Sequence, residues 1–289
     1  MNNHVEVERI TIITFAHHKG GTGKTTSCLN IAGFLAKSGK NVLVVDVDPQ
    51  ANATSGLGID PDSLKAGMYD LFMGKCPGFQ PITITDIILK TKSGVDIAPS
   101  SLELVGAEPF LYTTEERATM LSEILLPVRN RYDYILIDTP PSMGQFVING
   151  LVASDHTVIT FDRGVFALHG LHTLMTIFSD IKEIIGTRIT PDLAILTRWD
   201  CEETDKGGIR AFISRISRKR TPSMAKEEEM IREFEGEVRK YFNLVYPVPY
   251  SREIYEAQKA GLPISHFAAE SPAGKAYSGI AEVIQKWQV

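Results

Sequence analysis

The 289-residue chain is predicted to fold as an α/β protein: one doubly wound, mostly parallel sheet with helices on both faces. Two observations predict this class. Short apolar runs alternate with helical patterns along the chain, and the runs are apolar at successive positions, as expected of strands covered on both faces. We find no linker, repeat or low-complexity tract, so a single domain over residues 1–289 is expected.

The first unit is a strand, a loop, a helix and a second strand within residues 9–47. Residues 9–16 are β-branched and apolar and lead into glycines. From Lys24 to Lys37 apolar residues recur at helical spacing, and Gly39 provides a stop. The run NVLVVDV follows at 41–47. Further strands are expected at 95–98, 133–138, 157–161, 192–197 and 244–248. Further helices are expected at 114–130, 143–153, 166–185, 228–242 and from Ser271-Pro272 to about Trp287.

Bulk properties exclude several classes of protein. The chain is 43% hydrophobic and 22% charged, which is ordinary for a globular protein. No apolar run reaches the roughly 18 residues that span a bilayer, and the first ten residues carry Glu6 and Glu8, so we expect a cytoplasmic protein. Three widely spaced cysteines suggest no metal clamp or disulfide framework. A net charge of −5 gives no general attraction to polyanions.

The loop between the first strand and its helix has the sequence HHKGGTGKTT, at 17–26. Glycines there allow backbone N–H groups to wrap around phosphate oxygens, and the helix N-terminus adds a favourable dipole. The strand, the glycines, the Lys-Thr pair and the helix occur together, so an incidental glycine-rich turn is a weak alternative. The residues expected to contact a nucleotide are Gly20, Gly21, Thr22, Gly23, Lys24, Thr25 and Thr26.

Three side chains of this loop have distinct predicted tasks. Lys24 can bridge the β- and γ-phosphates, and Thr25 places a hydroxyl where Mg²⁺ sits between them. Thr26 can hold the α-phosphate. The loop therefore predicts ATP and Mg²⁺ as cofactors.

The loop departs from the ordinary GxxxxGK[ST] pattern, because His18 holds the first glycine position and Lys19 follows it. In this it resembles the deviant Walker A family, KGGxGK[ST], and within it the ParA/Soj partition ATPases and their MinD relatives. The resemblance covers most of the chain. It implies a homodimer on ATP in which Lys19 reaches across to the partner's nucleotide, where a second cation stabilises the transferred phosphoryl group. The alternative is a solvated loop lysine.

The second predicted strand ends in VDVDPQANATSGLG, at 45–58, and contributes two carboxylates. Asp46 and Asp48 are two residues apart, so they project to the same side of the strand. The resemblance implies that Asp48 positions the attacking water and that Asp46 supports the Mg²⁺ and lysine network. Carboxylates at strand ends are also common as simple caps, and that interpretation stays open for both.

A second motif, YDYILIDTPPS at 132–142, places Asp138 at the carboxyl end of an apolar strand. There Asp138 can hold Mg²⁺ directly or through water. The following residues, 139–142, resemble the second switch of the family, whose backbone senses the γ-phosphate.

The adenine site follows from position in the family. The base is expected between the end of the strand that carries Thr197 and Arg198 and the loop VPYS, at 248–251. Arg198 can stack on the ring, and Pro249 with the adjacent Tyr250 can offer an apolar face. Arg198 can equally pack on the indole of Trp199.

The segment GIRAFISRISRKR, at 208–220, is a candidate for binding DNA. Its apolar residues recur at i, i+3, i+4 and i+7, and the cations avoid that stripe. The cations are Arg210, Arg215, Arg218, Lys219 and Arg220. They can bind DNA phosphates, or form a solvated face paired with acids at 227–229. Residues 201–243 look like a helical insertion relative to compact ParA proteins, and Gly164 and Glu253 also depart from the family pattern.

The sequence thus predicts a ParA/Soj-like ATPase that dimerises on ATP, binds DNA non-specifically and hydrolyses ATP to partition or position a chromosome, plasmid or other cargo. The resemblance implies a ParB-like or cargo-adaptor partner and association with the nucleoid. One alternative is a MinD-like membrane-cycling regulator of division. The final segment AEVIQKWQV has a single lysine, which disfavours membrane binding. The other alternative is a P-loop metabolic enzyme.

Overall fold

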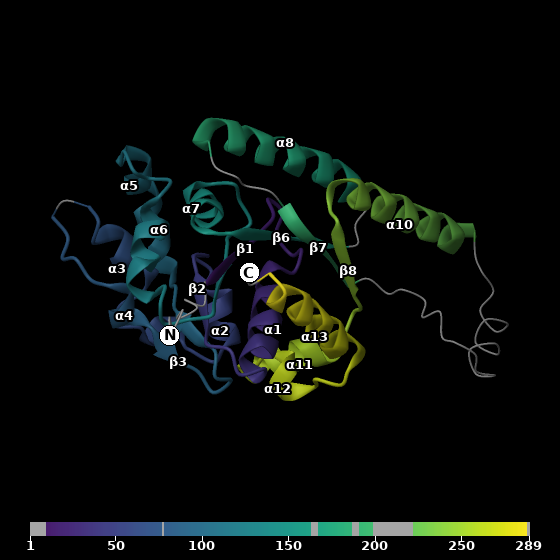
Figure 1. Cartoon of the computed structure of the whole chain (residues 1–289), viewed down its shortest axis with the longest axis horizontal. Coiled ribbons are helices and arrows are strands. Elements are labelled where there is room, and N and C mark those ends of the chain that lie inside the picture. Colours follow the sequence, from purple (N-terminus) through teal and green to yellow (C-terminus); the bar gives the residue numbers. More distant parts are fainter. Residues whose placement is uncertain (1–9, 77, 163–166, 187–190, 199–221, 288–289) are drawn as a thin grey trace, which may run out of the picture.

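The structure is a computed structural model that describes residues 10–76, 78–162, 167–186, 191–198 and 222–287 (Figure 1). Its centre is an eight-stranded sheet with the strand order β3-β4-β2-β5-β1-β6-β7-β8. All neighbouring strands are parallel except β3 and β4. The strands are β1 Thr11–Ala16, β2 Val42–Asp46, β3 Leu89–Lys90, β4 Asp96–Ala98, β5 Tyr134–Asp138, β6 His156–Asp162, β7 Pro191–Thr197 and β8 Leu244–Val248.

Helices cover both faces of this sheet (Figure 1). The long ones are α1 Lys24–Lys37, α7 Gln145–Ala153, α8 Ala167–Ile185, α10 Pro222–Tyr241, α11 Arg252–Lys259 and α13 Pro272–Gln285. The short ones are α2 Asn52–Gly56, α3 Met68–Met73, α4 Ile84–Ile87, α5 Glu108–Thr113, α6 Met120–Leu125 and α12 Ile264–Phe267. Single turns of 3₁₀ helix lie at η1 Pro61–Ser63 and η3 Leu126–Val128, and a longer one at η2 Leu102–Ala107.

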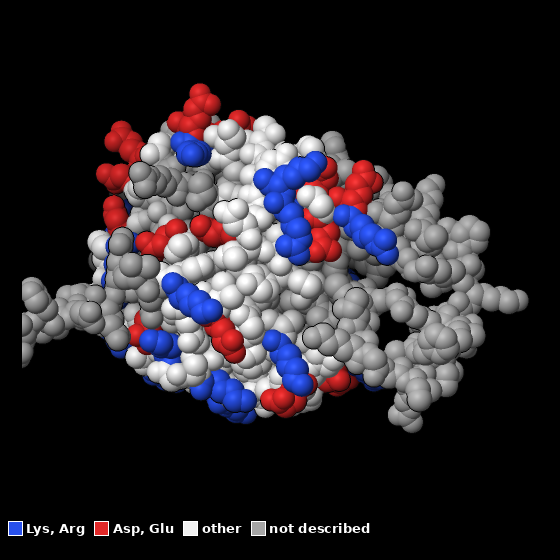
Figure 2. Space-filling model, turned by 45° about the vertical axis from the view of Figure 1, so that its right-hand side comes forward, with Lys and Arg blue, Asp and Glu red and all other residues white. Residues whose placement is uncertain are grey.

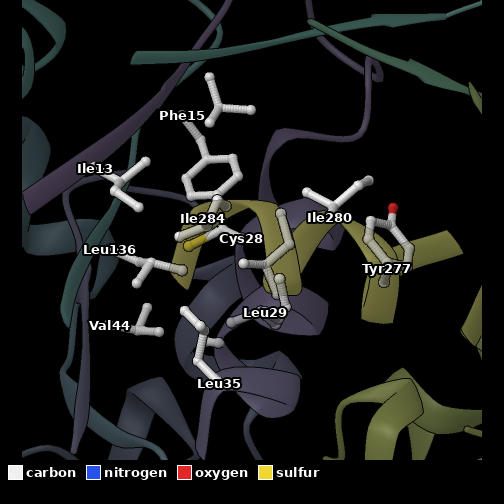
Figure 3. Packing of buried hydrophobic residues seen from close by; sticks show 14 of the residues in the cluster. Ile13, Phe15, Cys28, Leu29, Leu35, Val44, Leu136, Tyr277, Ile280 and Ile284 are labelled. Carbon is white, nitrogen blue, oxygen red and sulfur yellow. The ribbon is translucent and has the colours of Figure 1, made fainter. Parts of the chain in front are cut away.

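Successive side chains of a strand point to opposite faces of the sheet, so the core has a layer on each face. Ile13 and Phe15 of β1 pack with α1 and α13 on one face, as Figure 3 shows, whereas Ile12 packs on the other face beside α3 and α6. Farther along the second face, α7, α8 and α10 cover β6 and β7. Every residue of β1, β2 and β5 is buried, which explains why these strands are apolar at successive positions. The predicted fold class is confirmed.

Helix boundaries differ clearly from the prediction in two regions. The helix α10 begins at Pro222, ahead of the expected start at 228. The expected helix at 114–130 is broken into the short α6 and the turn η3, and α5 precedes it. Pro127 at the start of η3 lacks an N–H, so it cannot continue the hydrogen-bond ladder of α6. No helix within the described ranges is long and apolar enough to cross a membrane.

The parallel strands bring their carboxyl ends to one edge of the sheet. Asp46 is in register with Asp138, and Asp162 with Thr197. The loop after β1 starts at this same edge, because β1 lies between β5 and β6. Crevices at this edge are where ligands bind in doubly wound sheets.

Candidate functional site

The phosphate loop is shaped by glycines with left-handed backbone. Gly21 has φ +75° and Gly23 has φ +90°, and Gly23 is the residue before the first turn of α1. A Cβ on Gly23 would lie 2.8 Å from Cγ2 of Thr197. Two features therefore disfavour any side chain at Gly23: its left-handed backbone conformation and the close approach of β7.

Two threonines at the ends of β6 and β7 fix the loop to the sheet. The hydroxyls of Thr22 and Thr160 are 2.9 Å apart, and both threonines are buried. The hydroxyl of Thr197 donates to the carbonyl of Thr22 at 2.9 Å. The loop backbone is thus held in place before any ligand arrives, which reduces the ordering cost of binding.

The two lysines of the loop differ in environment. Lys24 is 6% exposed, and its Nζ lies 3.4 Å from the carbonyl oxygen of Lys19. Burial lowers the pKa of Lys24, while the nearby carboxylates of Asp138 and Asp48 act in the opposite direction. The side chain of Lys19 is half exposed, and its Nζ lies 3.5 Å from Oδ1 of Asp162.

The two carboxylates after β2 have different partners. Asp46 is fully buried and accepts from the backbone of Asp48 and from both the N–H and the hydroxyl of Thr54. Asp48 accepts from the backbone N–H of Gln50 at 2.9 Å and faces the cavity described below. Asp46 therefore anchors the start of α2 to β2, beneath the cavity, and does not line it.

Asp138 is less satisfied than Asp46 and Asp48. Both of its carboxylate oxygens are buried and neither has a hydrogen-bond partner of good geometry. Burial, with the neighbouring Asp46 charge, raises its pKa well above the usual value, and the nearby Thr25 hydroxyl counteracts this shift. A buried carboxylate without partners, beside a hydroxyl and a lysine, fits a divalent cation that would supply the missing charge.

Part of the loop, with Asp48, lines a cavity of about 810 Å³. Its wall includes ten residues predicted from the sequence: Gly20, Gly21, Gly23, Lys24, Thr25, Thr26, Asp48, Arg198, Pro249 and Tyr250. Lys19, Thr22, Asp46 and Asp138 do not line it. The volume is within the range of small-molecule and cofactor sites.

Comparisons with known proteins identify the family of the chain. A family model described as an AAA domain matches residues 10–195. Sporulation initiation inhibitor protein Soj of Bacillus subtilis is 34% identical over 277 residues, which cover 94% of this chain and 97% of that protein. Chromosome-partitioning ATPase Soj of Treponema pallidum is 31% identical, with 94% and 96% coverage. The chain belongs to the ParA/Soj family of P-loop ATPases.

Other matches of this ParA/Soj chain are partial or distant. A Pseudomonas putida protein is 39% identical over 184 residues, which span 64% of this chain and 66% of that protein. Cobyrinic acid a,c-diamide synthase from Mycobacterium smegmatis, solved with an ATP analog and magnesium, has a TM-score of 0.74 at 24% identity and covers 96% of both chains. MinD from Pyrococcus horikoshii, complexed with Mg-ADP, has a TM-score of 0.68 at 21% identity and 96% coverage of both chains. The two solved structures share the fold.

The predicted adenine residues Arg198, Pro249 and Tyr250 all line this cavity. Arg198 follows β7, and Pro249 and Tyr250 follow β8. The guanidinium of Arg198 donates to the carbonyl of Gly21, and its Nη2 lies 3.2 Å from Oδ2 of Asp162. The alternative contact of Arg198 with Trp199 lies outside the described residues.

The sequence reasoning missed two groups of the site. Asp162 closes β6 as Asp138 closes β5, and it approaches both Lys19 and Arg198. An acid after an apolar strand was a usable signal, but the strand was predicted to end at 161. Gln258 of α11 donates to the hydroxyl of Thr26 at 3.1 Å. No motif marks α11, and only the tertiary structure brings it to the loop.

The candidate DNA-binding residues Arg210, Arg215, Arg218, Lys219 and Arg220 lie outside the described residues, as does Gly164. Among described residues on the face shown in Figure 2, lysines and arginines are interspersed with acids. Two ion pairs on α10 join Arg239 to Glu235 and Lys240 to Glu237. The prediction of a basic surface therefore still depends on residues 208–220.

Proposed function

We propose that this chain is a ParA/Soj-like ATPase that binds Mg-ATP in the cavity at the carboxyl edge of the sheet and hydrolyses it within an ATP-bound dimer. One observation carries the proposal. Lys24, Thr25 and the unpartnered carboxylate of Asp138 lie next to a preformed loop, whose positive-φ glycines leave room for phosphate oxygens.

Each residue has a proposed task that follows from its environment. The loop amides and Lys24 hold the phosphates, and Thr25 with Asp138 holds Mg²⁺, which neutralises charge on the phosphate oxygens when bound. Arg198, Pro249 and Tyr250 border the space for the base. Asp46 acts indirectly, because its hydrogen bonds to Thr54 and Asp48 fix the segment that carries Asp48.

Asp48 is proposed to orient the attacking water. It is 5% exposed, faces the cavity and accepts one backbone hydrogen bond, which leaves a second carboxylate oxygen for water. Burial raises its pKa, with the charge of Lys24 opposing, so a proton can be held there more readily than on an ordinary aspartate. A group of this kind suits proton transfer from water in the transition state.

Lys19 is proposed to act in the partner subunit. Within the described part of the chain, its half-exposed ammonium forms one ion pair, with Asp162 at 3.5 Å, so little interaction energy is lost when it moves to a phosphate of another copy. A second cation at the transferred phosphoryl group stabilises charge that develops in the transition state.

The cellular role follows from the family. The Treponema pallidum relative is a chromosome-partitioning ATPase, and we propose that this chain likewise partitions or positions a chromosome, plasmid or other cargo. We further propose that the dimer binds DNA non-specifically through residues 208–220, that a ParB-like or cargo-adaptor protein stimulates turnover, that the protein is cytoplasmic and nucleoid-associated, and that residues 1–289 form one domain.

The proposed chemistry is tested with Asp48→Asn, which removes the charge but retains an oxygen for the Gln50 N–H. ATP affinity should stay within about threefold, while single-turnover hydrolysis should fall about 10²- to 10⁴-fold, the usual contribution of a positioned base. A matched control is Asp60→Asn, since Asp60 also accepts from the residue two positions later but lies outside the cavity. Wild-type hydrolysis in Asp48→Asn, or loss of ATP binding, would contradict the assignment.

A further inference from the structure

The phosphate loop begins with two histidines, His17 and His18, and the proposed chemistry uses neither. His17 is 3% exposed. Its ring stacks on that of His18, with centroids 4.6 Å apart, and meets the edge of Phe161 at 5.4 Å. The imidazole of His17 is therefore fixed between β6 and the start of the loop.

The fixed ring accepts a hydrogen bond from the loop. Nδ1 of His17 accepts from the backbone N–H of Lys19 at 2.9 Å. On the other side of the same residue, the carbonyl of Lys19 faces Nζ of Lys24 at 3.4 Å. Both backbone polar groups of Lys19 are thus engaged, and the direction in which its side chain leaves the loop is set by these contacts.

The charge state of His17 suits this role. Burial, together with the charges of His18, Lys24 and Lys19, lowers its pKa to about 3. The ring is neutral at physiological pH, and acceptance at Nδ1 places the proton on Nε2. A protonated imidazole has no acceptor and would leave the Lys19 N–H without a partner.

We propose that His17 is a positioning residue for Lys19: its Nδ1 holds the Lys19 peptide so that the side chain points out of the loop toward the nucleotide of a second copy of this chain. The inference rests on the proposed role of Lys19 across the dimer. It assigns the positioning of Lys19 to the hydrogen-bonding nitrogen of His17 rather than to the bulk of the ring.

Two amide substitutions separate these possibilities. Asn carries its oxygen at the same number of bonds from Cα as Nδ1, so His17→Asn can still accept from Lys19. The side-chain oxygen of Gln corresponds to Nε2, so His17→Gln retains polarity and more of the volume but removes the acceptor from its place. Equal changes in both variants would reveal a packing role of the ring.

The measurements are the monomer–dimer equilibrium with a non-hydrolysable ATP analogue, by light scattering, and the affinity of the monomer for ADP. Without the acceptor, the Lys19 peptide has to be ordered when the dimer forms, which weakens association about five- to tenfold for each subunit. The symmetric dimer contains two such peptides, so the dimer dissociation constant of His17→Gln should rise about 25- to 100-fold. His17→Asn should stay within about fivefold. ADP affinity should change less than about threefold in both variants, because Lys24 and the loop glycines remain.

The outcomes decide between the claims. Wild-type dimerisation of His17→Gln, equal weakening of both variants, or loss of ADP binding would overturn the role of His17. If wild-type protein fails to dimerise on the analogue, the proposed function fails instead. Amide hydrogen exchange at Lys19 in the nucleotide-free protein then tests the inference separately. Exchange about tenfold faster in His17→Gln but not in His17→Asn would support it, and equal exchange in all three proteins would overturn it.

Discussion

Replacing Gly23 by Ala should damage nucleotide binding through the backbone conformation at this position and through one close contact. Gly23 has φ +90°, and an added Cβ would lie 2.8 Å from Cγ2 of Thr197. Thr197 cannot easily rotate away, because its hydroxyl is hydrogen-bonded within the site to the carbonyls of Thr22 and Phe161. The loop must therefore move, and with it the N–H groups that are proposed to hold phosphate.

The size of the effect has two parts. Left-handed backbone costs a residue with a Cβ about 1–2 kcal/mol, and overpacking a tight contact costs about 1–3 kcal/mol. Together these predict an affinity for ADP about 30-fold to several thousandfold weaker. Thr197→Ser removes Cγ2 but keeps the hydroxyl. In the double variant the contact at 2.8 Å disappears, while Cβ and Oγ1 of residue 197 remain at 3.3 Å.

The assay is a double-mutant cycle on ADP affinity, with thermal unfolding as a control for folding. Thr197→Ser should restore part of the affinity of Gly23→Ala, by about 1 kcal/mol or roughly fivefold, and leave the cost of the backbone conformation. Strictly additive effects of the two substitutions would refute the contact as the cause. Full recovery would refute the contribution of the backbone.

Three further predictions concern buried ionisable groups. In Asp138→Asn, the nucleotide-free protein should unfold at a higher temperature, because the substitution neutralises a buried carboxylate that has no partners. Mg²⁺ should no longer strengthen ADP binding to this variant, because the proposed cation ligand is lost. The folded-state pKa values of Asp138 and Asp46 are raised, that of Asp46 to about 7, so wild-type stability without nucleotide should fall as pH rises from the ordinary value of 3.8 toward 7. Calorimetry at several pH values should show a shallower fall in Asp138→Asn, and an unchanged slope would contradict this. Cys28 is fully buried and its pKa is raised, so thiol reagents should modify it only after the protein unfolds. Peptide mass spectrometry measures this labelling. Rapid labelling of Cys28 in the native protein would contradict the packing of α1.

The sequence predicted the parts of the fold that depend on local pattern. The strands β1, β2 and β5 and the helix α1 were found because apolar runs and glycines follow one another within 9–47 and 132–142. The short elements α2 to α5 were missed, because segments of four to six residues carry too little periodicity to separate from loops. Pro127 is the sequence signal for the break between α6 and η3, because proline lacks the N–H that would continue the helix.

The same division applies to the candidate site. The loop residues and the two acids Asp48 and Asp138 stand within motifs, and the structure brings them to one edge of the sheet. Asp46 shows the limit of this reasoning, because spacing places it beside Asp48, whereas its hydrogen bonds to Thr54 show an anchoring contact. The contacts of Asp162 and Gln258 join segments far apart in the chain, and no spacing rule predicts them.

The central claim is that a second copy of the chain completes the nucleotide site through Lys19. The most direct measurement is the molar mass of wild type and of Lys19→Gln by light scattering, with ADP and with a non-hydrolysable ATP analogue. We expect wild type to be a monomer with ADP and a dimer with the analogue. Lys19→Gln should bind both nucleotides, through Lys24 and the loop amides, and remain a monomer. An analogue-bound wild-type monomer, or a Lys19→Gln dimer of wild-type affinity, would contradict the claim.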